Sequence, residues 1–193
     1  MTVVLRNVVA ATAALGVIGV VAAPAALAES GDPRVPDREV SVPVAPKTDV
    51  VTAHGPLSDL AAGGPFDGAR AVVVMVTRDF RSTVQLRVQG IDRGAAGRTF
   101  GAHLHVGPCV ADDGAAAGPH YNADVIAGRM PPHVDRSTEV WLDFTVTPGG
   151  AGAATAVVPF RPQPGDRSIV IHQEPTDHHG AAGARLACVP LSW

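Results

Sequence analysis

The stretch Phe100-Gly-Ala-His-Leu-His105 decides the fold prediction, because it places two histidines at alternating positions. Side chains in a β-strand repeat with a period of two, so His103 and His105 share one face of a strand, about 7 Å apart along the chain. That spacing is right for two imidazoles that approach one metal ion. The alternative is an edge strand that carries two solvated histidines.

Two further histidines occur in comparable stretches. His120 lies in Gly118-Pro-His-Tyr-Asn122, and His172 ends the apolar run Ile169-Val-Ile-His172. They reach the first pair only if the chain folds back over it. Four imidazoles would suit copper, because its affinity for nitrogen ligands is the highest of the first-row divalent metals.

The sequence around these histidines alternates with a period of two rather than 3.6. Val84, Leu86 and Val88 alternate with polar residues, which indicates a half-buried strand. Further strands are predicted within 71–76, 100–105, 140–146, 154–160, 168–172 and 185–191. No amphipathic helix of ten residues stands out. Short strands between turns predict an all-β sandwich or barrel, with two long loops after the histidine-bearing strands.

The N-terminal part has a different composition. Residues 8–23 are apolar except for Thr12, and Ala26-Leu-Ala28 has the small residues that a signal peptidase requires. We therefore predict a secretory signal over 1–28, with a retained membrane anchor as the alternative. Residues 29–48 are rich in proline and charge and predict an extended leader, so the folded domain is expected over 49–193.

Charge and cysteine content restrict the function classes. The formal net charge is −3 and the sequence has no basic stripe, so nucleic acid is not an expected partner. The two cysteines, Cys109 and Cys188, indicate a disulfide in an exported chain. A thiolate metal pair is the alternative. After signal cleavage no membrane span is expected, and no oligomeric state is predicted.

Five segments in order resemble the copper/zinc superoxide dismutases, bacterial secreted members in particular. They are Gly101-Ala-His-Leu-His105, Cys109, Gly118-Pro-His-Tyr-Asn122, Ile171-His-Gln-Glu-Pro175 and Gly183-Ala-Arg-Leu-Ala-Cys188. The resemblance covers about 71–189. It implies an eight-stranded Greek-key β-barrel that disproportionates superoxide to O2 and H2O2.

The resemblance also implies residue roles. His103, His105, His120 and His172 would bind copper, and His120 would in addition supply a proton. Arg185 would guide the superoxide anion, because a guanidinium stays charged at any relevant pH. Cys109 and Cys188 would form the disulfide of the family.

The chain departs from the family in two places. A zinc set would consist of His120, His133 and Asp135, with Asp124 as a speculative fourth ligand, whereas structural zinc normally has four. Zinc is therefore expected to be absent or weakly bound. The segment between His172 and Arg185 is short, as in the copper-only members.

The sequence supports two functions of different kinds. The first is an exported superoxide dismutase that uses copper alone. The second is a non-catalytic domain for copper binding or storage on the same scaffold. His178 and His179 lie in the short segment, as solvated residues or as accessory copper ligands, and His54 has no predicted role.

Overall fold

The computed structural model describes residues 47–193. The predicted signal (1–28) and all of the predicted leader (29–48) except its last two residues lie outside the described residues. The first strand, β1, begins at Thr48, close to the predicted start of the domain. Among the described residues, no helix is long and apolar enough to cross a membrane.

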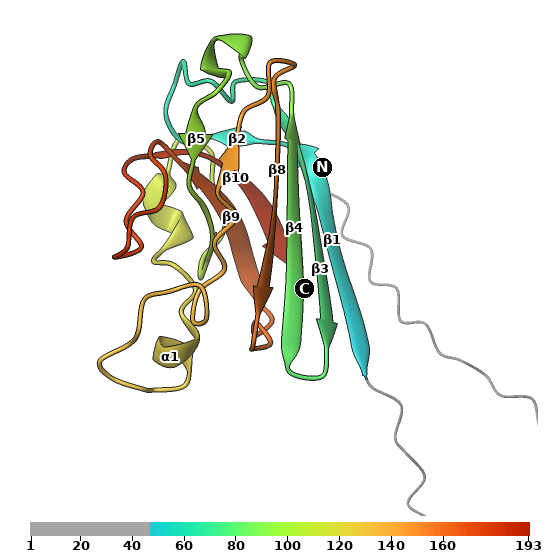
Figure 1. The fold of residues 1–193 in the computed structure, drawn as a ribbon, viewed down its shortest axis with the longest axis vertical. Helices are drawn as coiled ribbons and strands as arrows, with labels where there is room; N and C mark the ends of the chain where they lie inside the picture. Colours follow the sequence, from blue (N-terminus) through green and yellow to red (C-terminus); the bar gives the residue numbers. More distant parts are fainter. Residues whose placement is uncertain (1–46) are drawn as a thin grey trace, which may run out of the picture. The chain divides into compact units, whose positions relative to one another are not determined.

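The described chain forms a sandwich of antiparallel sheets (Figure 1). One sheet has the order β1-β3-β4-β8, with β1 (Thr48–Pro56), β3 (Arg70–Arg78), β4 (Arg81–Gln89) and β8 (Ala151–Val158). The second has the order β2-β10-β9-β6, with β2 (Ser58–Asp59), β10 (Arg185–Ser192), β9 (Asp166–His172) and β6 (Ala102–His105). A small third sheet pairs β5 (Thr99–Phe100) with β7 (Phe144–Thr145).

The core lies between the two larger sheets and follows from the alternation. In β4, Val84, Leu86 and Val88 are fully buried, whereas the residues between them face outward. Phe66 packs edge-on against Phe100 and Phe144, with ring centroids 5.0 and 6.2 Å apart. This aromatic cluster contributes to the core that supports β6, the strand of the first histidine pair.

The prediction of an all-β fold is confirmed, and most predicted strands are present. The predicted strand 140–146 is wrong in extent, because only Phe144–Thr145 forms a strand, while Glu139 and Trp141 make isolated bridges to Asn122 and His103. Strands β1 and β2 were not predicted. Helical structure in the described residues is limited to η1 (Arg93–Ala95), η2 (Gly114–Ala117) and α1 (Ala123–Ile126).

Candidate metal centre

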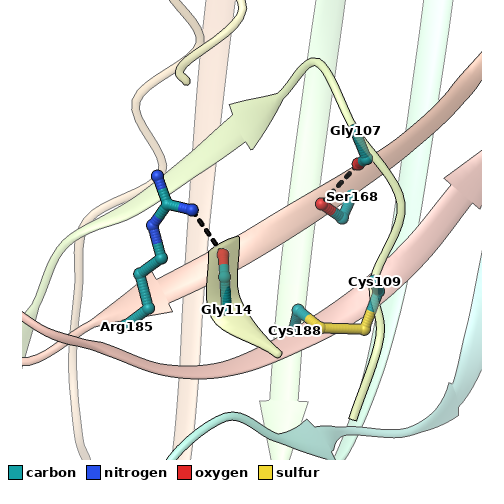
Figure 2. The surroundings of a disulfide bond; sticks show 6 residues. All are labelled: Gly107, Cys109, Gly114, Ser168, Arg185 and Cys188. Carbon is teal, nitrogen blue, oxygen red and sulfur yellow. Dashed lines mark hydrogen bonds between the residues drawn. A yellow bond between two sulfur atoms is a disulfide. The ribbon is translucent and has the colours of Figure 1, made fainter. Parts of the chain in front are cut away.

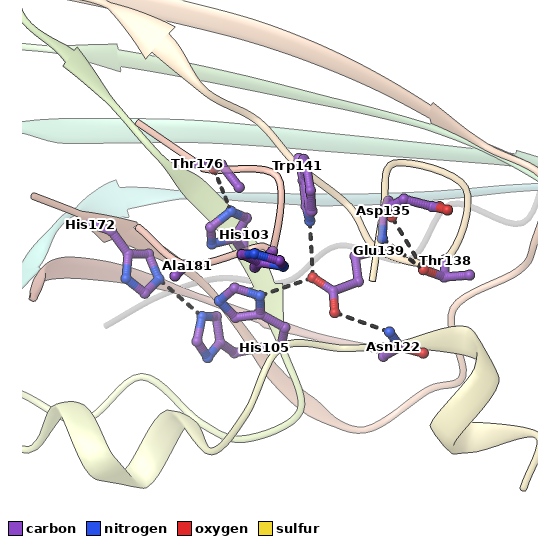
Figure 3. A network of polar contacts seen from close by, with 12 residues as sticks. His103, His105, Asn122, Asp135, Thr138, Glu139, Trp141, His172, Thr176 and Ala181 are labelled. Carbon is purple, nitrogen blue, oxygen red and sulfur yellow. Dashed lines mark hydrogen bonds and ion pairs between the residues drawn. The ribbon is translucent and has the colours of Figure 1, made fainter. Parts of the chain in front are cut away.

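Four histidines from distant parts of the sequence gather at β6 and β9. His103 and His105 lie on β6, His172 ends β9, and His120 joins β6 through an isolated bridge to His105. One ligand atom from each lies within 4.8 Å of those of the other three. The pairing of β6 with β9 places His103 opposite Val170, and His172 at the end of β9 donates its backbone N–H to Gly101, so the ring of His172 lies beside the pair (Figure 3).

The hydrogen bonds of His105 and His172 leave two bare nitrogens face to face. His105 Nδ1 donates to the carbonyl of Gly118 (2.9 Å), and His172 Nδ1 donates to the carbonyl of Gly183 (3.2 Å). A neutral imidazole has one N–H, so both Nε2 atoms carry lone pairs. These Nε2 atoms are only 3.2 Å apart. A metal cation between two lone pairs at that distance would satisfy both.

His103 presents a bare nitrogen to the same point for a separate reason. Thr176 Oγ1 donates to Asp143, so it accepts from His103 Nε2, which lies 2.7 Å away. The proton of His103 is therefore on Nε2. The side chain is fully buried, and its Nδ1 has no hydrogen-bond partner. A buried acceptor without a partner is costly, and a metal ion would satisfy it.

His120 completes the set, and Glu139 orients it. His120 Nδ1 donates to Glu139 Oε2 (2.9 Å), which leaves Nε2 free. The same carboxylate accepts from Trp141 Nε1 (2.9 Å) and, through Oε1, from Asn122 Nδ2 (3.0 Å). Burial opposes ionisation of Glu139, but these three donors outweigh it and lower its pKa. An ionised carboxylate behind a ligating imidazole fixes the ring and makes it a stronger ligand.

Burial favours the neutral form of three imidazoles of the cluster, His103, His105 and His172. Burial, reinforced by the neighbouring histidines, lowers the pKa of His103. Burial likewise lowers the pKa of His105 to about 3 and that of His172 to about 4, with Arg185 adding to both effects. Neutral imidazole is the form that binds metals. The cluster is thus prepared to accept a metal cation in preference to a proton.

Acid is expected to destabilise the metal-free protein. His105 and His172 bind protons near pH 6.5 when unfolded but only at about 3 and 4 when folded. Because the unfolded state binds more protons between pH 6.5 and 4, the free energy of unfolding falls as the pH falls through that range. Thermal denaturation of metal-free protein at pH 7.5, 6 and 5 measures this. A midpoint that is constant or rises toward pH 5 contradicts it, and exposed His54→Gln should keep the slope.

Arg185 lies next to the cluster and is tied to it by one carbonyl. Its guanidinium donates to the carbonyls of Gly114 and Gly118, the latter at 2.6 Å from Nη2. The Gly118 carbonyl also accepts from His105 Nδ1. Gly118 has φ +65, and a Cβ there would lie 2.9 Å from Val106 Cγ2, so only glycine fits this turn.

A disulfide holds the same loop to β10. Cys109 and Cys188 form the predicted bond, and Cys188 follows Arg185 by three residues on β10 (Figure 2). Ser168 on β9 adds a hydrogen bond to the carbonyl of Gly107 (2.9 Å). Both ties lie shortly before Gly114, so they fasten the start of the loop that carries both carbonyl partners of Arg185. A disulfide is typical of a protein that folds in an oxidising compartment outside the cytoplasm.

Comparisons with known proteins agree with this architecture. No family model matches the chain, and no curated protein matches it. Among solved structures, it is similar to a double mutant of a SOD-like protein from Bacillus subtilis. The TM-score is 0.52 at 18% sequence identity, and the match covers 72% of this chain and 97% of that chain. The fold is SOD-like.

The SOD-like scaffold does not gather the predicted zinc residues. In the part of the chain that the structure describes, the one metal-capable cluster contains the four histidines and neither His133 nor Asp135. His120 Nδ1 is already bonded to Glu139. The His133 side chain is 81% exposed, and its Nδ1 lies 2.9 Å from Asp124 Oδ2. Asp135 instead accepts from the backbone and hydroxyl of Ser137.

The other predicted histidines lie outside the cluster. His178 and His179 are exposed, with their rings 3.8 Å apart, in the segment between β9 and β10. That segment folds back on itself through backbone bonds from Gln173 to Ala184 and from Glu174 to Ala182. His54 is exposed on β1, in the other sheet. In the described part of the chain, none of these three histidines belongs to the four-histidine cluster.

Sequence reasoning missed the residues that orient the ligands. Glu139, Thr176 and Asp143 received no role, and Trp141 was read only as a strand residue. One signal was available for Glu139, a lone acid directly before the apolar run Val140-Trp-Leu142. A carboxylate in such a run is buried and therefore needs donors. No comparable pattern marks Thr176.

Proposed function

We propose that this protein is an exported superoxide dismutase that uses copper. The observation that carries the proposal is the convergence of four imidazoles whose hydrogen bonds leave a bare nitrogen on each. Four nitrogen ligands suit copper, and the hydrogen-bonded partners behind them suit a permanent site. The SOD-like fold and the position of Arg185 support the redox function over other copper chemistry.

The ligand set fits the group, and the residues around it have defined tasks. Bound copper would supply the one-electron exchange by which one superoxide becomes O2 and a second, with two protons, becomes H2O2. Arg185 supplies positive charge next to the ligands and attracts the anion. His120, whose side chain is 20% exposed, is the ligand that reaches solvent. With Nδ1 held by Glu139, Nε2 would be the ligand atom and, whenever it does not ligate, the atom that would carry a proton from water to reduced oxygen.

The direct test is superoxide consumption by the copper-loaded full chain, measured by pulse radiolysis or stopped flow. We expect second-order turnover near the diffusion limit that falls with ionic strength. Arg185→Ala should slow it about tenfold or more, because steering of a charged substrate contributes 10- to 1000-fold. Arg185→Lys should retain part of the rate. Stoichiometric copper without turnover would contradict the proposal.

Glu139→Gln tests how His120 is positioned. The amide carries no charge, so His120 loses an anionic acceptor, and copper affinity or turnover should fall about 10- to 100-fold. The pH profile of superoxide loss should also shift, which a purely structural defect would not produce. Asp124→Asn is the matched control, because it alters a carboxylate–histidine pair outside the cluster. Equal effects of both variants would contradict a specific role for Glu139.

One observation favours a second candidate, a non-catalytic copper-binding domain. The guanidinium of Arg185 donates hydrogen bonds to the carbonyls of Gly114 and Gly118, so Arg185 also holds this loop in place. In a copper store, Arg185→Ala would lower stability and leave copper affinity unchanged. The superoxide assay distinguishes the two candidates.

A further inference from the structure

The outward face of the sheet β1-β3-β4-β8 carries several exposed valines. Residues of these strands alternate between the core and this outward face. Three of the outward valines are Val50, Val72 and Val157, which are 38%, 46% and 53% exposed. The registers place Val50 beside Val76 and Thr83 beside Val157. These side chains form a flat surface rich in β-branched residues, which we call the valine face.

The charges on the valine face are all positive. Arg70 and Arg78 on β3 and Arg81 and Arg87 on β4 point outward, and no outward position of the four strands carries an acid. Among the described residues, none of these four arginines forms an ion pair. Strand pairing places Arg78 opposite Arg81 at the hairpin end, whereas Arg70 and Arg87 lie near the other end of the two strands. Although the whole chain has a net charge of −3, the charge of this face is positive, so the face favours an anionic partner.

The β3–β4 hairpin ends this face in an exposed aromatic ring. Phe80 is 82% exposed, and Arg78 pairs with Arg81 across the turn. Together with Val76, Thr83, Asp79 and Pro159, these residues line a surface hollow of about 590 Å³. Asp79 is the one acid at the tip. This arrangement suits the headgroup region of a membrane. Aromatic rings insert at the interface between headgroups and acyl chains, and guanidinium groups bind the lipid phosphates.

The chain enters the domain at the same end. Lys47 accepts a backbone hydrogen bond from Asp79 at the hairpin tip (3.1 Å), and 46 residues precede it, among them the apolar run 8–23 (Figure 1). The histidine cluster belongs to the other sheet. A surface bound to the valine face would therefore leave the metal centre open to solvent.

We propose that the valine face, with the hairpin tip foremost, binds the surface of an anionic phospholipid bilayer. Phe80 enters the interface, and Arg78 and Arg81 contact headgroup phosphates. A second copy of the chain fits less well, because a two-fold contact would set arginines against arginines. Nucleic acid fits less well because the exposed valines and Phe80 gain nothing from a phosphate backbone.

A spin label at the hairpin tip tests this on the full chain. The sequence has two cysteines, both in the disulfide, so Phe80→Cys creates a single thiol for a nitroxide. With phosphatidylglycerol/phosphatidylcholine vesicles, the label should become immobilised and gain access to oxygen over a water-soluble nickel chelate. Arg93→Cys, at the opposite end of β4, is the matched control and should stay aqueous. Arg78→Gln/Arg81→Gln should raise the half-saturating lipid concentration about 30-fold.

Each other outcome overturns the proposal. A label at position 80 that stays aqueous with anionic vesicles, or immerses equally in pure phosphatidylcholine, excludes a site for anionic lipid. Immobilisation without vesicles shows that the preceding segment or a second copy covers the tip. An unchanged half-saturation in the double variant shows that the arginines are not involved. The readout needs no metal, so it is independent of superoxide turnover.

Discussion

His103→Ala is expected to weaken copper binding more than about 100-fold, since loss of a residue that merely orients a ligand already costs 10- to 100-fold. Nδ1 of His103 is buried without a hydrogen-bond partner, and Thr176 holds the ring so that this atom meets the other three ligands. The loss removes one of four nitrogens and leaves the geometry around the ion incomplete. Competition with a chelator, followed through the copper absorption band, measures the affinity.

The exposed His133 provides the control for that experiment. His133→Ala removes an imidazole that lies outside the cluster, so copper affinity should remain that of the unaltered protein. Circular dichroism of both metal-free variants checks that the fold is retained. Unchanged affinity in His103→Ala would show that the ion, if bound, is held elsewhere.

Loss of the disulfide is expected to lower the free energy of unfolding by about 2–4 kcal/mol. The bond joins residues 79 apart in sequence, so it removes a large loop entropy from the unfolded chain. The double variant Cys109→Ser/Cys188→Ser avoids an odd thiol. Its thermal midpoint should fall roughly 8–15 °C for a domain of this size.

Reduction of the unaltered protein provides the comparison. Dithiothreitol should bring its urea-unfolding midpoint to that of the double variant. The variant should also lose part of the Arg185 effect on superoxide turnover, because the loop that carries Gly114 and Gly118 then has no covalent tie to β10. Equal midpoints for oxidised, reduced and substituted protein would contradict a stabilising role.

Local sequence patterns predicted most strands, but they did not predict that the four histidines converge. Period-two alternation marked β4, which buries one face, and a continuous apolar run marked β3. The alternating histidines marked β6, all of whose residues are buried. Their alternation placed His103 and His105 together, but the approach of His120 and His172 came from the resemblance. That approach depends on the pairing of β6 with β9, a long-range register that no local pattern encodes.

The residues behind the ligands were hidden for a related reason. Glu139 and Thr176 act through hydrogen bonds to histidines 19 and 73 residues away. Such partners are selected by the folded geometry and leave little trace in composition. The valine face shows the same limit, since its exposed valines Val50, Val72 and Val157 share one surface only through the pairing of β1, β3, β4 and β8.

The spread of the four imidazoles from residue 103 to residue 172 has a consequence for biogenesis. An unfolded chain has no preformed chelate, so an ion captured early would sit on arbitrary donors. Metallation must then follow the closure of the sandwich, and in the exported protein proposed above, if it folds after export, the ion would be taken up outside the cell interior. The mature holoprotein would thus report the metal status of its surroundings rather than that of the cytoplasm where it was translated.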